Sequence, residues 1–249
     1  MAVDIDVKKL LEAGAHFGHK TSRWHPKMGQ YIHSRRGGVH IIDLTKTVDS
    51  LEKATKFVSE IAAKNRQVLF VGTKRQSQEI LQKAAEGAGQ PFVVERWFGG
   101  LLTNQLTIKT RIKHLKDLEE KMASGELAAK YNKLEIQRYQ EEIDRLNLNF
   151  GGIKDMAGHP GAVFVSDVVT DQIAVKEANR LKIPVIAIVD TNADPTNIDY
   201  PIPANDDAIK SITLITDYIV SAIESGKAKV KKADKDEQPV ETTKTKEEK

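Results

Sequence analysis

The stretch AVFVSDVVTDQIAVKEANRLKIPVIAIVD, residues 162–190, decides the fold. It begins with the short aliphatic run at 162–166 and ends with a second run at 184–190, and residues 170–181 between them are predicted to be helical. Uninterrupted aliphatic strands are typical of a sheet that is covered on both faces. Two such strands joined by a helix predict a βαβ unit, in which the strands are parallel.

The same alternation extends over most of the chain. The expected helices are 3–13, 47–64, 75–86, 170–181 and 209–224, and the expected strands are 67–73, 91–95, 162–166 and 184–190. Short strands that alternate with helices predict βαβ units throughout. The sequence therefore predicts an α/β fold, a parallel sheet flanked by helices, in one globular domain made of residues 1–105 and 149–225.

Residues 106–148 interrupt the alternation and form an insertion. Two helical stretches, 106–122 and 126–148, are separated by a serine and a glycine. Apolar residues repeat at spacings of three and four along them: Ile108, Ile112, Leu115 and Leu118, then Leu127, Tyr131 and Leu134. A narrow apolar seam with charge elsewhere predicts an antiparallel coiled-coil hairpin that projects as an arm. An ordinary pair of packing helices is the alternative.

The last residues, 226–249, are predicted to be a disordered charged tail. They contain eight lysines, six acids and no aromatic residue. Such a segment buries too little apolar surface to offset the entropy of ordering it.

Composition excludes several classes of protein. The 249 residues include no cysteine, which excludes disulfides, zinc fingers, iron–sulfur clusters and thiol catalysis. The longest apolar runs are about five residues, whereas a membrane helix needs about 20. The N-terminus has no signal-peptide core. We therefore expect a cytoplasmic protein with no membrane partner.

Residues 14–42 form a basic segment that contains no Asp or Glu. It holds five Lys or Arg and five of the seven His of the chain, interleaved with Phe17, Trp24 and Tyr31, and a short hairpin is expected around 31–33 and 39–42. Cations bind phosphates, and aromatic or guanidinium planes stack on unpaired bases. The pattern predicts an RNA-binding segment. A flexible basic loop without a target is the alternative.

The chain lacks the common catalytic motifs. P-loop, G-x-S-x-G and H-E-x-x-H patterns do not occur. A dinucleotide fingerprint that began at Gly72 would need glycines where Lys74 and Ser77 stand, although Glu95 ends the next strand as a ribose-binding acid would. Lys74 and Arg75 follow a strand and open a helix, a position that favours phosphate. A solvated helix start is the alternative reading of these two cations.

A few residues invite a metal or carboxylate site. His16 and His19 are three residues apart, and Asp190 ends a strand at the carboxyl edge of the sheet, but no third ligand follows from the spacing. Asp190, Asn192 and Asp194 are more typical of turns and helix caps. We expect no metal, cofactor or small-molecule substrate.

The motif WFGGLLTN at 97–104 directly precedes the arm. Trp97 or Phe98 is expected to anchor the root of the arm in the core, while the two glycines form the corner. An exposed docking surface is the alternative.

Five long motifs carry a family resemblance. They are AGAHFGHKTSRWHPKM at 13–28, VLFVGTKRQ at 68–76, RWFGGLLTN at 96–104, VVTDQIAVKEANRLKIPVIAIVDTNADP at 168–195 and YPIPANDDAIKSI at 200–212. In their order, their spacing and the inserted arm, residues 1–225 resemble the ribosomal protein S2 family of the bacterial small subunit.

The resemblance implies a flavodoxin-like or Rossmann-like parallel sheet with a coiled-coil protrusion. It implies a structural constituent of the small ribosomal subunit, without catalytic activity, located near the head–body junction. The expected partners are small-subunit ribosomal RNA and neighbouring ribosomal proteins, including a large messenger-binding one that this chain would help to dock.

Both the globular domain and the arm touch RNA in the family. Carried onto this chain, the expected RNA contacts are His16, His19, Lys20, Arg23, Trp24, Lys27, Arg35 and Arg36, with Lys74, Arg75, Lys109, Arg111 and Lys113 as a second tier. Lys and Arg would bind phosphates, while Trp24 and the His rings would contact sugars and bases. Two other hypotheses are an α/β enzyme acting on a nucleotide or phosphosugar, and an adaptor that binds only protein through its arm.

Overall fold

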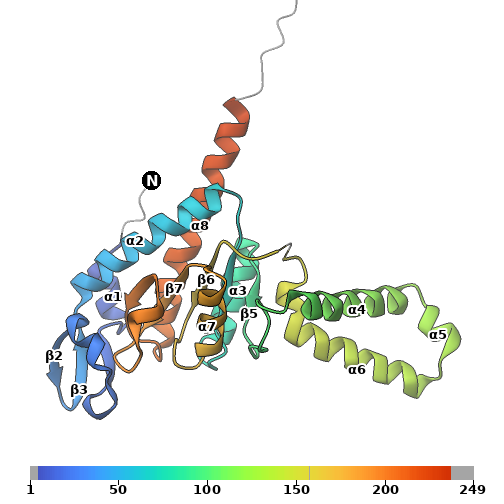
Figure 1. The fold of residues 1–249 in the computed structure, drawn as a ribbon, viewed down its shortest axis with the longest axis horizontal. Coiled ribbons are helices and arrows are strands. Elements are labelled where there is room, and N and C mark those ends of the chain that lie inside the picture. The colour runs from blue at the N-terminus through green and yellow to red at the C-terminus, as the bar shows by residue number, and fades with distance from the viewer. Residues whose placement is uncertain (1–4, 157, 237–249) are drawn as a thin grey trace, which may run out of the picture.

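A five-stranded parallel sheet forms the centre of the molecule (Figure 1). The computed structural model describes residues 5–156 and 158–236. The strands are β4 (Val68–Val71), β5 (Phe92–Val93), β6 (Ala162–Val165), β7 (Val185–Val189) and β8 (Tyr200–Pro203). Their order, β5-β4-β6-β7-β8, is the 2-1-3-4-5 order of flavodoxin-like sheets. The prediction of an α/β fold with a parallel sheet is confirmed.

The edge strand β8 was not predicted from the sequence. It pairs in parallel with β7, from Ile186 opposite Tyr200 to Val189 opposite Pro203. Two of its four residues are prolines, Pro201 and Pro203, and proline ordinarily argues against a strand. It is accepted here because β8 lies at the edge of the sheet.

Both faces of the parallel sheet are buried, so the side chains of its strands alternate between two apolar layers. Val68 and Phe70 of β4 point to one layer, whereas Leu69 and Val71 point to the other. The first layer is covered by α1 (Val7–Glu12), α2 (Leu44–Ala63), α3 (Gln78–Ala88) and α8 (Ile209–Asp236). The second is covered by α7 (Gln172–Arg180) and by the base of the insertion. No helix within the described residues is both long enough and apolar enough to cross a membrane.

The basic segment folds into a small antiparallel sheet. Its strands are β1 (Phe17–Lys20), β2 (Ile32–Arg36) and β3 (Val39–Ile42), in the order β1-β3-β2, with the short 3₁₀ helices η1 (Thr21–Arg23) and η2 (Pro26–Tyr31) between β1 and β2. The hairpin expected around 31–33 and 39–42 is confirmed, whereas β1 was not predicted. In Figure 1 this sheet and the inserted helices lie at opposite ends of the body.

The insertion is a helical hairpin that projects from the body (Figure 1). Its helices are α4 (Gln105–Ala123), α5 (Glu126–Lys130) and α6 (Lys133–Phe150), and the 3₁₀ helix η3 (Gly151–Ile153) leads back to the sheet. Apolar contacts between α4 and α6 involve Leu115, Leu118, Ile143 and Leu146. The structure confirms a projecting hairpin, while coiled-coil packing of its helices stays a prediction.

The apolar seam predicted for the second helical stretch is confirmed at Leu127, which is buried, and wrong at the two residues that follow it. Tyr131 and Leu134 are exposed, because the chain is extended at Tyr131 and a new helix begins after Asn132. The Asn132 side chain accepts from the Glu135 amide while the Glu135 carboxylate accepts from the Asn132 amide. This reciprocal capping box starts a helix wherever it falls in an apolar repeat.

The last helix is longer than predicted. α8 continues to Asp236, well into the segment expected to be a disordered tail from residue 226, while 237–249 lie outside the described residues. Gly226 is buried against α2, where a Cβ would lie 2.7 Å from the Ala62 Cβ and closer still to the Ser59 carbonyl. The Lys227 ammonium donates to the Ala88 carbonyl at 2.6 Å. Tertiary contacts therefore extend a helix that composition alone does not favour.

This packing predicts opposite effects of two glycine-to-alanine changes in helices. Gly226→Ala is expected to lower the free energy of unfolding by about 1–3 kcal/mol, because the new methyl group overpacks the contact between α8 and α2. Gly87→Ala in α3, where a Cβ meets nothing within 4 Å, is expected to raise it by about 0.5–1 kcal/mol. Urea unfolding followed by circular dichroism measures both, and equal effects would contradict the packing of residue 226.

Candidate nucleic-acid interface

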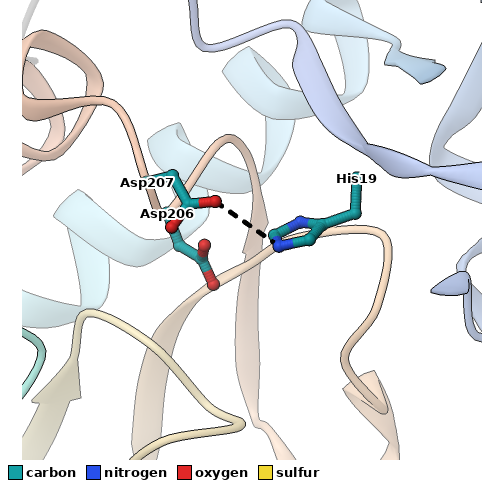
Figure 2. Close-up of side chains that lie close together, drawn as sticks. All are labelled: His19, Asp206 and Asp207. Carbon is teal, nitrogen blue, oxygen red and sulfur yellow. Dashed lines mark ion pairs between the residues drawn. The ribbon is translucent and has the colours of Figure 1, made fainter.

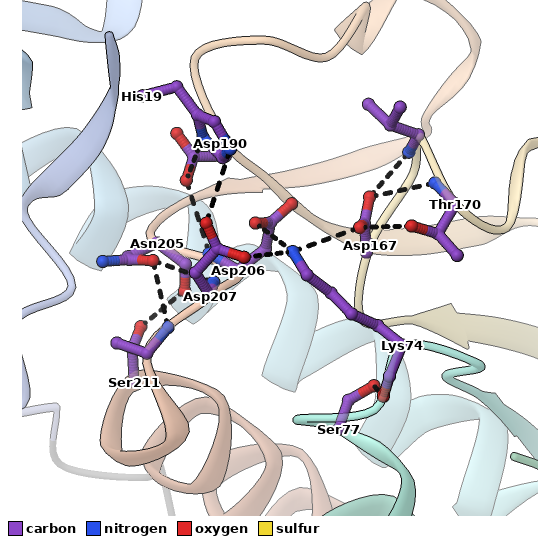
Figure 3. Close-up of polar contacts among 12 residues, drawn as sticks. His19, Lys74, Ser77, Asp167, Thr170, Asp190, Asn205, Asp206, Asp207 and Ser211 are labelled. Carbon is purple, nitrogen blue, oxygen red and sulfur yellow. Dashed lines mark hydrogen bonds and ion pairs between the residues drawn. The ribbon is translucent and has the colours of Figure 1, made fainter.

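A half-buried cation, Lys74, joins three loops at the carboxyl edge of the sheet (Figure 3). Its ammonium lies 2.6 Å from the Asp207 carboxylate, 2.9 Å from Asp206 and 3.3 Å from Asp167. Lys74 follows β4, Asp167 follows β6, and the other two carboxylates follow β8. One side chain that follows β4 therefore neutralises charge that β6 and β8 bring to this edge.

The charges of this cluster alter each other's ionisation. Burial lowers the pKa of Lys74, but the attraction of Asp207, Asp206 and Asp167 outweighs burial and raises it above its ordinary value. Burial, together with repulsion from Asp167 and Asp190, raises the pKa of Asp206 to about 7. The cluster thus holds more negative charge than Lys74 alone can balance.

His19 links the basic segment to this cluster (Figures 2 and 3). Its Nδ1 lies 3.1 Å from the Asp190 carboxylate and its Nε2 lies 3.4 Å from Asp207. A hydrogen bond with Asp190, helped by the other nearby carboxylates, raises the pKa of His19 against the effect of burial. The His19 amide also donates to the Thr191 hydroxyl at 2.9 Å. These contacts of His19 therefore fasten β1 to the loops at the end of the sheet.

The same carboxylates could also hold a divalent cation. One ligand atom each from His19, Asp206 and Asp207 lies within 4.8 Å of the others (Figure 2). A ring nitrogen with carboxylate oxygens is a donor set that zinc accepts. His16, which the sequence paired with His19, is not part of this group; its ring packs against Phe17 at 4.0 Å. Burial lowers the pKa of His16.

Two further contacts fix the basic segment to the loop after β7. The His25 amide donates to the Thr191 carbonyl at 2.7 Å. The Lys27 ammonium donates to Asp194 at 3.3 Å and to the Thr196 hydroxyl at 2.5 Å. Asp194 caps η4 (Pro195–Asn197), and hydrogen bonds from Thr196, helped by Lys27, lower the pKa of Asp194 to about 2. Asp194 is thus the helix cap that the sequence suggested.

Most of the predicted RNA-contacting residues lie on the surface. The exposed ones are Lys20, Arg23, Trp24, Lys27, Arg35, Arg36, Arg75, Lys109, Arg111 and Lys113. The small sheet brings some of them together: Lys20 and Arg36 lie opposite Val39 on its two sides. Trp24 is 42% exposed, which leaves much of its ring free to stack. Lys109, Arg111 and Lys113 occupy α4 at the far end of the body.

Lys74, like His16 and His19, is not among the exposed residues. Its side chain is 17% exposed and its ammonium is surrounded by carboxylates. This geometry favours a structural role over the phosphate contact predicted for it. The cluster could not be predicted from the sequence. Asp206 and Asp207 follow β8, and this strand was not predicted because it contains two prolines. The one available signal was the pair of acids in ANDDAI, directly after YPIP.

The space where a flavodoxin-like sheet binds phosphate is filled by the chain itself. This place is the switch point between β4 and β6. The Asp171 carboxylate accepts from the Thr73 amide at 3.1 Å and from the Thr73 hydroxyl at 2.8 Å. Burial raises the pKa of Asp171 to about 6. At Gly72 a Cβ would come within 2.7 Å of the Ser166 hydroxyl, so that turn is closed by packing.

Glu177 fixes the root of the helical hairpin. Its carboxylate accepts from the Trp97 indole at 3.1 Å and from the amides of Gly100, Leu102 and Thr103 at 2.6, 3.0 and 3.1 Å. Burial raises the pKa of Glu177, but these hydrogen bonds outweigh burial and lower it. Trp97 is 7% exposed, which confirms the prediction that it belongs to the core.

The geometry defines a class of protein before any comparison is made. It is a flavodoxin-like body whose ligand-binding edge is closed by its own carboxylates, with exposed cations on a small sheet at one end and on a projecting hairpin at the other. Such an arrangement suits a scaffold that binds a polyanion rather than an enzyme that binds a nucleotide.

Comparison with known proteins agrees with this class. The model of the ribosomal protein S2 family matches residues 10–226. The chain is 50% identical to the small ribosomal subunit protein uS2 of Chloroflexus aggregans over 222 residues, which is 89% of this chain and 93% of that protein. The uS2 proteins of Fusobacterium nucleatum and Dehalococcoides mccartyi are 49% and 48% identical, over 90% and 89% of their lengths.

The chain therefore belongs to the ribosomal protein S2 family. The resemblance inferred from the sequence motifs is confirmed. The family consists of structural ribosomal proteins and not of enzymes, which agrees with the expectation of no catalytic activity and removes the nucleotide-enzyme alternative.

The hydrogen bonds that Glu177 accepts at the hairpin root, called the clamp below, predict a pH-dependent loss of stability in Glu177→Gln. At pH 7 the free energy of unfolding should fall by about 2–3 kcal/mol, because the hydrogen bonds to a charged acceptor weaken. The lowered pKa means that the contribution is complete above the ordinary value of 4.5 and disappears as pH falls through the folded-state pKa. Urea titrations at pH 7 and pH 3 should therefore show a larger difference between variant and wild type at pH 7 than at pH 3.

The exposed Glu52 supplies the control for that experiment. Glu52→Gln should leave stability nearly unchanged at both pH values, since it removes only a solvated charge. A Glu177→Gln variant as stable as Glu52→Gln would contradict the clamp.

The cluster at the carboxyl edge predicts that Lys74→Met is strongly destabilising. Removing the cation leaves buried carboxylates without compensation, a change that costs about 3–5 kcal/mol. Lys83→Met removes an exposed ion pair with Glu79 one helical turn away and should cost less than about 1 kcal/mol. Thermal unfolding of the two variants measures the contrast, and similar melting temperatures would contradict it.

Proposed function

We propose that this chain is a structural constituent of the small ribosomal subunit that binds ribosomal RNA through its basic segment and its helical hairpin. The observation that carries the proposal is the small sheet, which presents Lys20, Arg35 and Arg36 to solvent on a segment without any acid. Membership of the ribosomal protein S2 family supports it. Ribosomal proteins act on the ribosome, so we also propose that location for the chain.

In this proposal the small sheet and α4 bind different elements of the RNA. On the small sheet, Lys20, Arg35 and Arg36 bind phosphates, and Trp24 stacks on an unpaired base. On α4, Lys109 and Lys113 lie one turn apart and bind the backbone of a second RNA element. The distance between the small sheet and the hairpin suits a protein that holds two RNA elements together.

The proposal also includes a location and a protein partner. The chain would lie near the head–body junction and would help to dock a large messenger-binding ribosomal protein. Exposed apolar side chains outside the basic regions, such as Val169 and Ile173, support a protein neighbour. His16 and His19 are kept as RNA contacts of lower rank, because both rings are partly enclosed.

The proposal predicts a specific change in salt dependence when Arg35→Ala and Arg36→Ala are combined. Binding to small-subunit ribosomal RNA should weaken, and the slope of log affinity against log salt should fall by about one for each phosphate that the variant no longer neutralises. Filter binding of the full chain between low and moderate salt measures this slope. An unchanged slope would remove these two arginines from the interface.

Lys8→Ala with Lys9→Ala is the matched control, because both lysines are neighbouring, exposed and outside the basic segment. It should leave the slope as in the wild type. In cells, the wild-type chain should co-sediment with small subunits at moderate salt, and the arginine variant should shift toward the top of the gradient. A wild-type chain found only at the top would contradict subunit membership.

A further inference from the structure

The small antiparallel sheet has one enclosed face and one face that is open to solvent. Along its central strand β3, His40 and Ile42 are buried, whereas Val39 and Ile41 are only partly buried. Successive side chains of a strand point to opposite faces of the sheet. His40 and Ile42 therefore lie on the enclosed face, and Val39 and Ile41 lie on the open one, which is called the outer face below.

The neighbouring strand β1 adds an aromatic ring and a cation to the outer face. Residues directly opposite each other in an antiparallel pair project from the same face of the sheet. Phe17 lies opposite Ile41, and Lys20 lies opposite Val39. The irregular register between these two pairs places both side chains of β1 on the outer face. Phe17 is 50% exposed there, and Lys20 is exposed as well.

The edge strand β2 separates two neighbouring arginines onto different faces. Arg36 lies opposite Val39 and therefore projects from the outer face, across β3 from Lys20. Arg35 lies opposite His40 and projects from the other face, although it too is exposed at this edge. The outer face thus has an apolar centre with one cation on each side.

The Phe17 ring is fixed by its own neighbours. Its centroid lies 4.0 Å from that of the His16 ring, at an interplanar angle of 40°. Its backbone amide donates to the Gly14 carbonyl at 3.3 Å. A half-exposed ring in a fixed position offers a flat apolar surface, and a partner that stacks on it loses little entropy from the protein side.

The charge of the outer face favours single-stranded RNA as its partner. None of the strands β1, β2 and β3 contains Asp or Glu. Protein sheets that bind RNA stack unpaired bases on exposed aromatic residues, and cations beside the ring bind the backbone. An apolar protein surface would cover Phe17 but would leave Lys20 and Arg36 without an anion. RNA supplies both a ring and phosphates.

We propose that the outer face of the small sheet binds one single-stranded segment of ribosomal RNA. In this site a base stacks on Phe17, and the neighbouring phosphates bind Lys20 and Arg36. The proposal rests on the RNA-binding function proposed above and adds a second base contact to that of Trp24. The two contacts are separate, because the Trp24 ring lies 5.4 Å from the ring of His40, which belongs to the enclosed face.

Two changes at Phe17 test the stacked base. Phe17→Leu keeps an apolar side chain without the aromatic plane. It should weaken binding of the full chain to purified small-subunit ribosomal RNA about tenfold, the size of one stacked base. Phe17→Tyr keeps the plane and should bind within about twofold of the wild type. The slope of log affinity against log salt should stay at the wild-type value in both, since no cation is removed.

Leu11→Ala is the matched control, because Leu11 is 53% exposed and lies on α1, outside the basic segment. Circular dichroism melts establish that each variant is folded. Wild-type affinity in folded Phe17→Leu would overturn the stacked base, while an unaltered salt slope would leave the RNA-binding function intact. Loss of a protein from reconstituted small subunits, with RNA affinity unchanged, would identify a protein as the occupant and also overturn the proposal.

The two arginines test the face, because they have equal charge and project from opposite sides of the sheet. Phe17→Leu is combined with Arg36→Ala or with Arg35→Ala, and RNA affinity is measured for each single and double variant. The effect of Phe17→Leu should shrink in the Arg36→Ala background, since both side chains hold the same segment of RNA. It should stay about tenfold in the Arg35→Ala background. Equal effects in the two backgrounds would contradict a shared segment on the outer face.

Ultraviolet crosslinking uses the unaltered chain and decides the question if Phe17→Leu does not fold. The complex with small-subunit ribosomal RNA is irradiated, digested with trypsin and examined by mass spectrometry. A nucleotide attached to Phe17, in the tryptic peptide 10–20, is expected because direct crosslinking requires contact with a base. Crosslinks confined to Trp24 and the hairpin would overturn the proposal.

Discussion

The structure depends on the pairing of Lys74 with the carboxylates at the end of the sheet. A parallel sheet brings the carboxyl ends of its strands to one edge, and here acids follow β6, β7 and β8, with Asp190 supplied by β7. Without a buried cation these loops would repel each other. With it, they form a fixed surface on which His19 anchors the basic segment through Asp190 and Asp207. The position of the exposed cations of the basic segment therefore depends on the half-buried ammonium of Lys74.

Carboxylates of the chain also occupy the switch point of the sheet, where other proteins with this fold bind a ligand. In a nucleotide-binding relative of the fold, the backbone amides after the first strand would face phosphate. Here the Asp171 carboxylate accepts from the Thr73 amide, so the chain supplies its own anion. Ser166 and the closed turn at Gly72 fill the remaining space. The edge that would bind a substrate has become internal structure, consistent with a fold whose function lies in other surfaces.

The sequence predicts the repeated elements well because their signals are local. Aliphatic strands and the helices between them reveal the parallel sheet, and the acid-free segment reveals its exposed cations. The failures are non-local or involve competing signals. Prolines concealed β8, and with it the acids Asp206 and Asp207 that surround Lys74. The capping box at Asn132 overrode an apolar repeat, and contacts of Gly226 with α2 extended a helix into a polar segment. The sequence around a lysine that follows a strand does not show whether its ammonium faces a phosphate or carboxylates of the same chain.

Two buried carboxylate contacts place the basic surfaces at opposite ends of one rigid body. Glu177 accepts hydrogen bonds from five donors in the loop at the hairpin root, and Asp190 holds the His19 ring at the other end. The sheet between them is close-packed and resists deformation. A protein that binds two segments of a flexible polyanion gains most when its binding surfaces are preorganised, because association then costs less entropy. Buried acids that fix the position of exposed cations therefore give a fold of this type two preorganised basic surfaces.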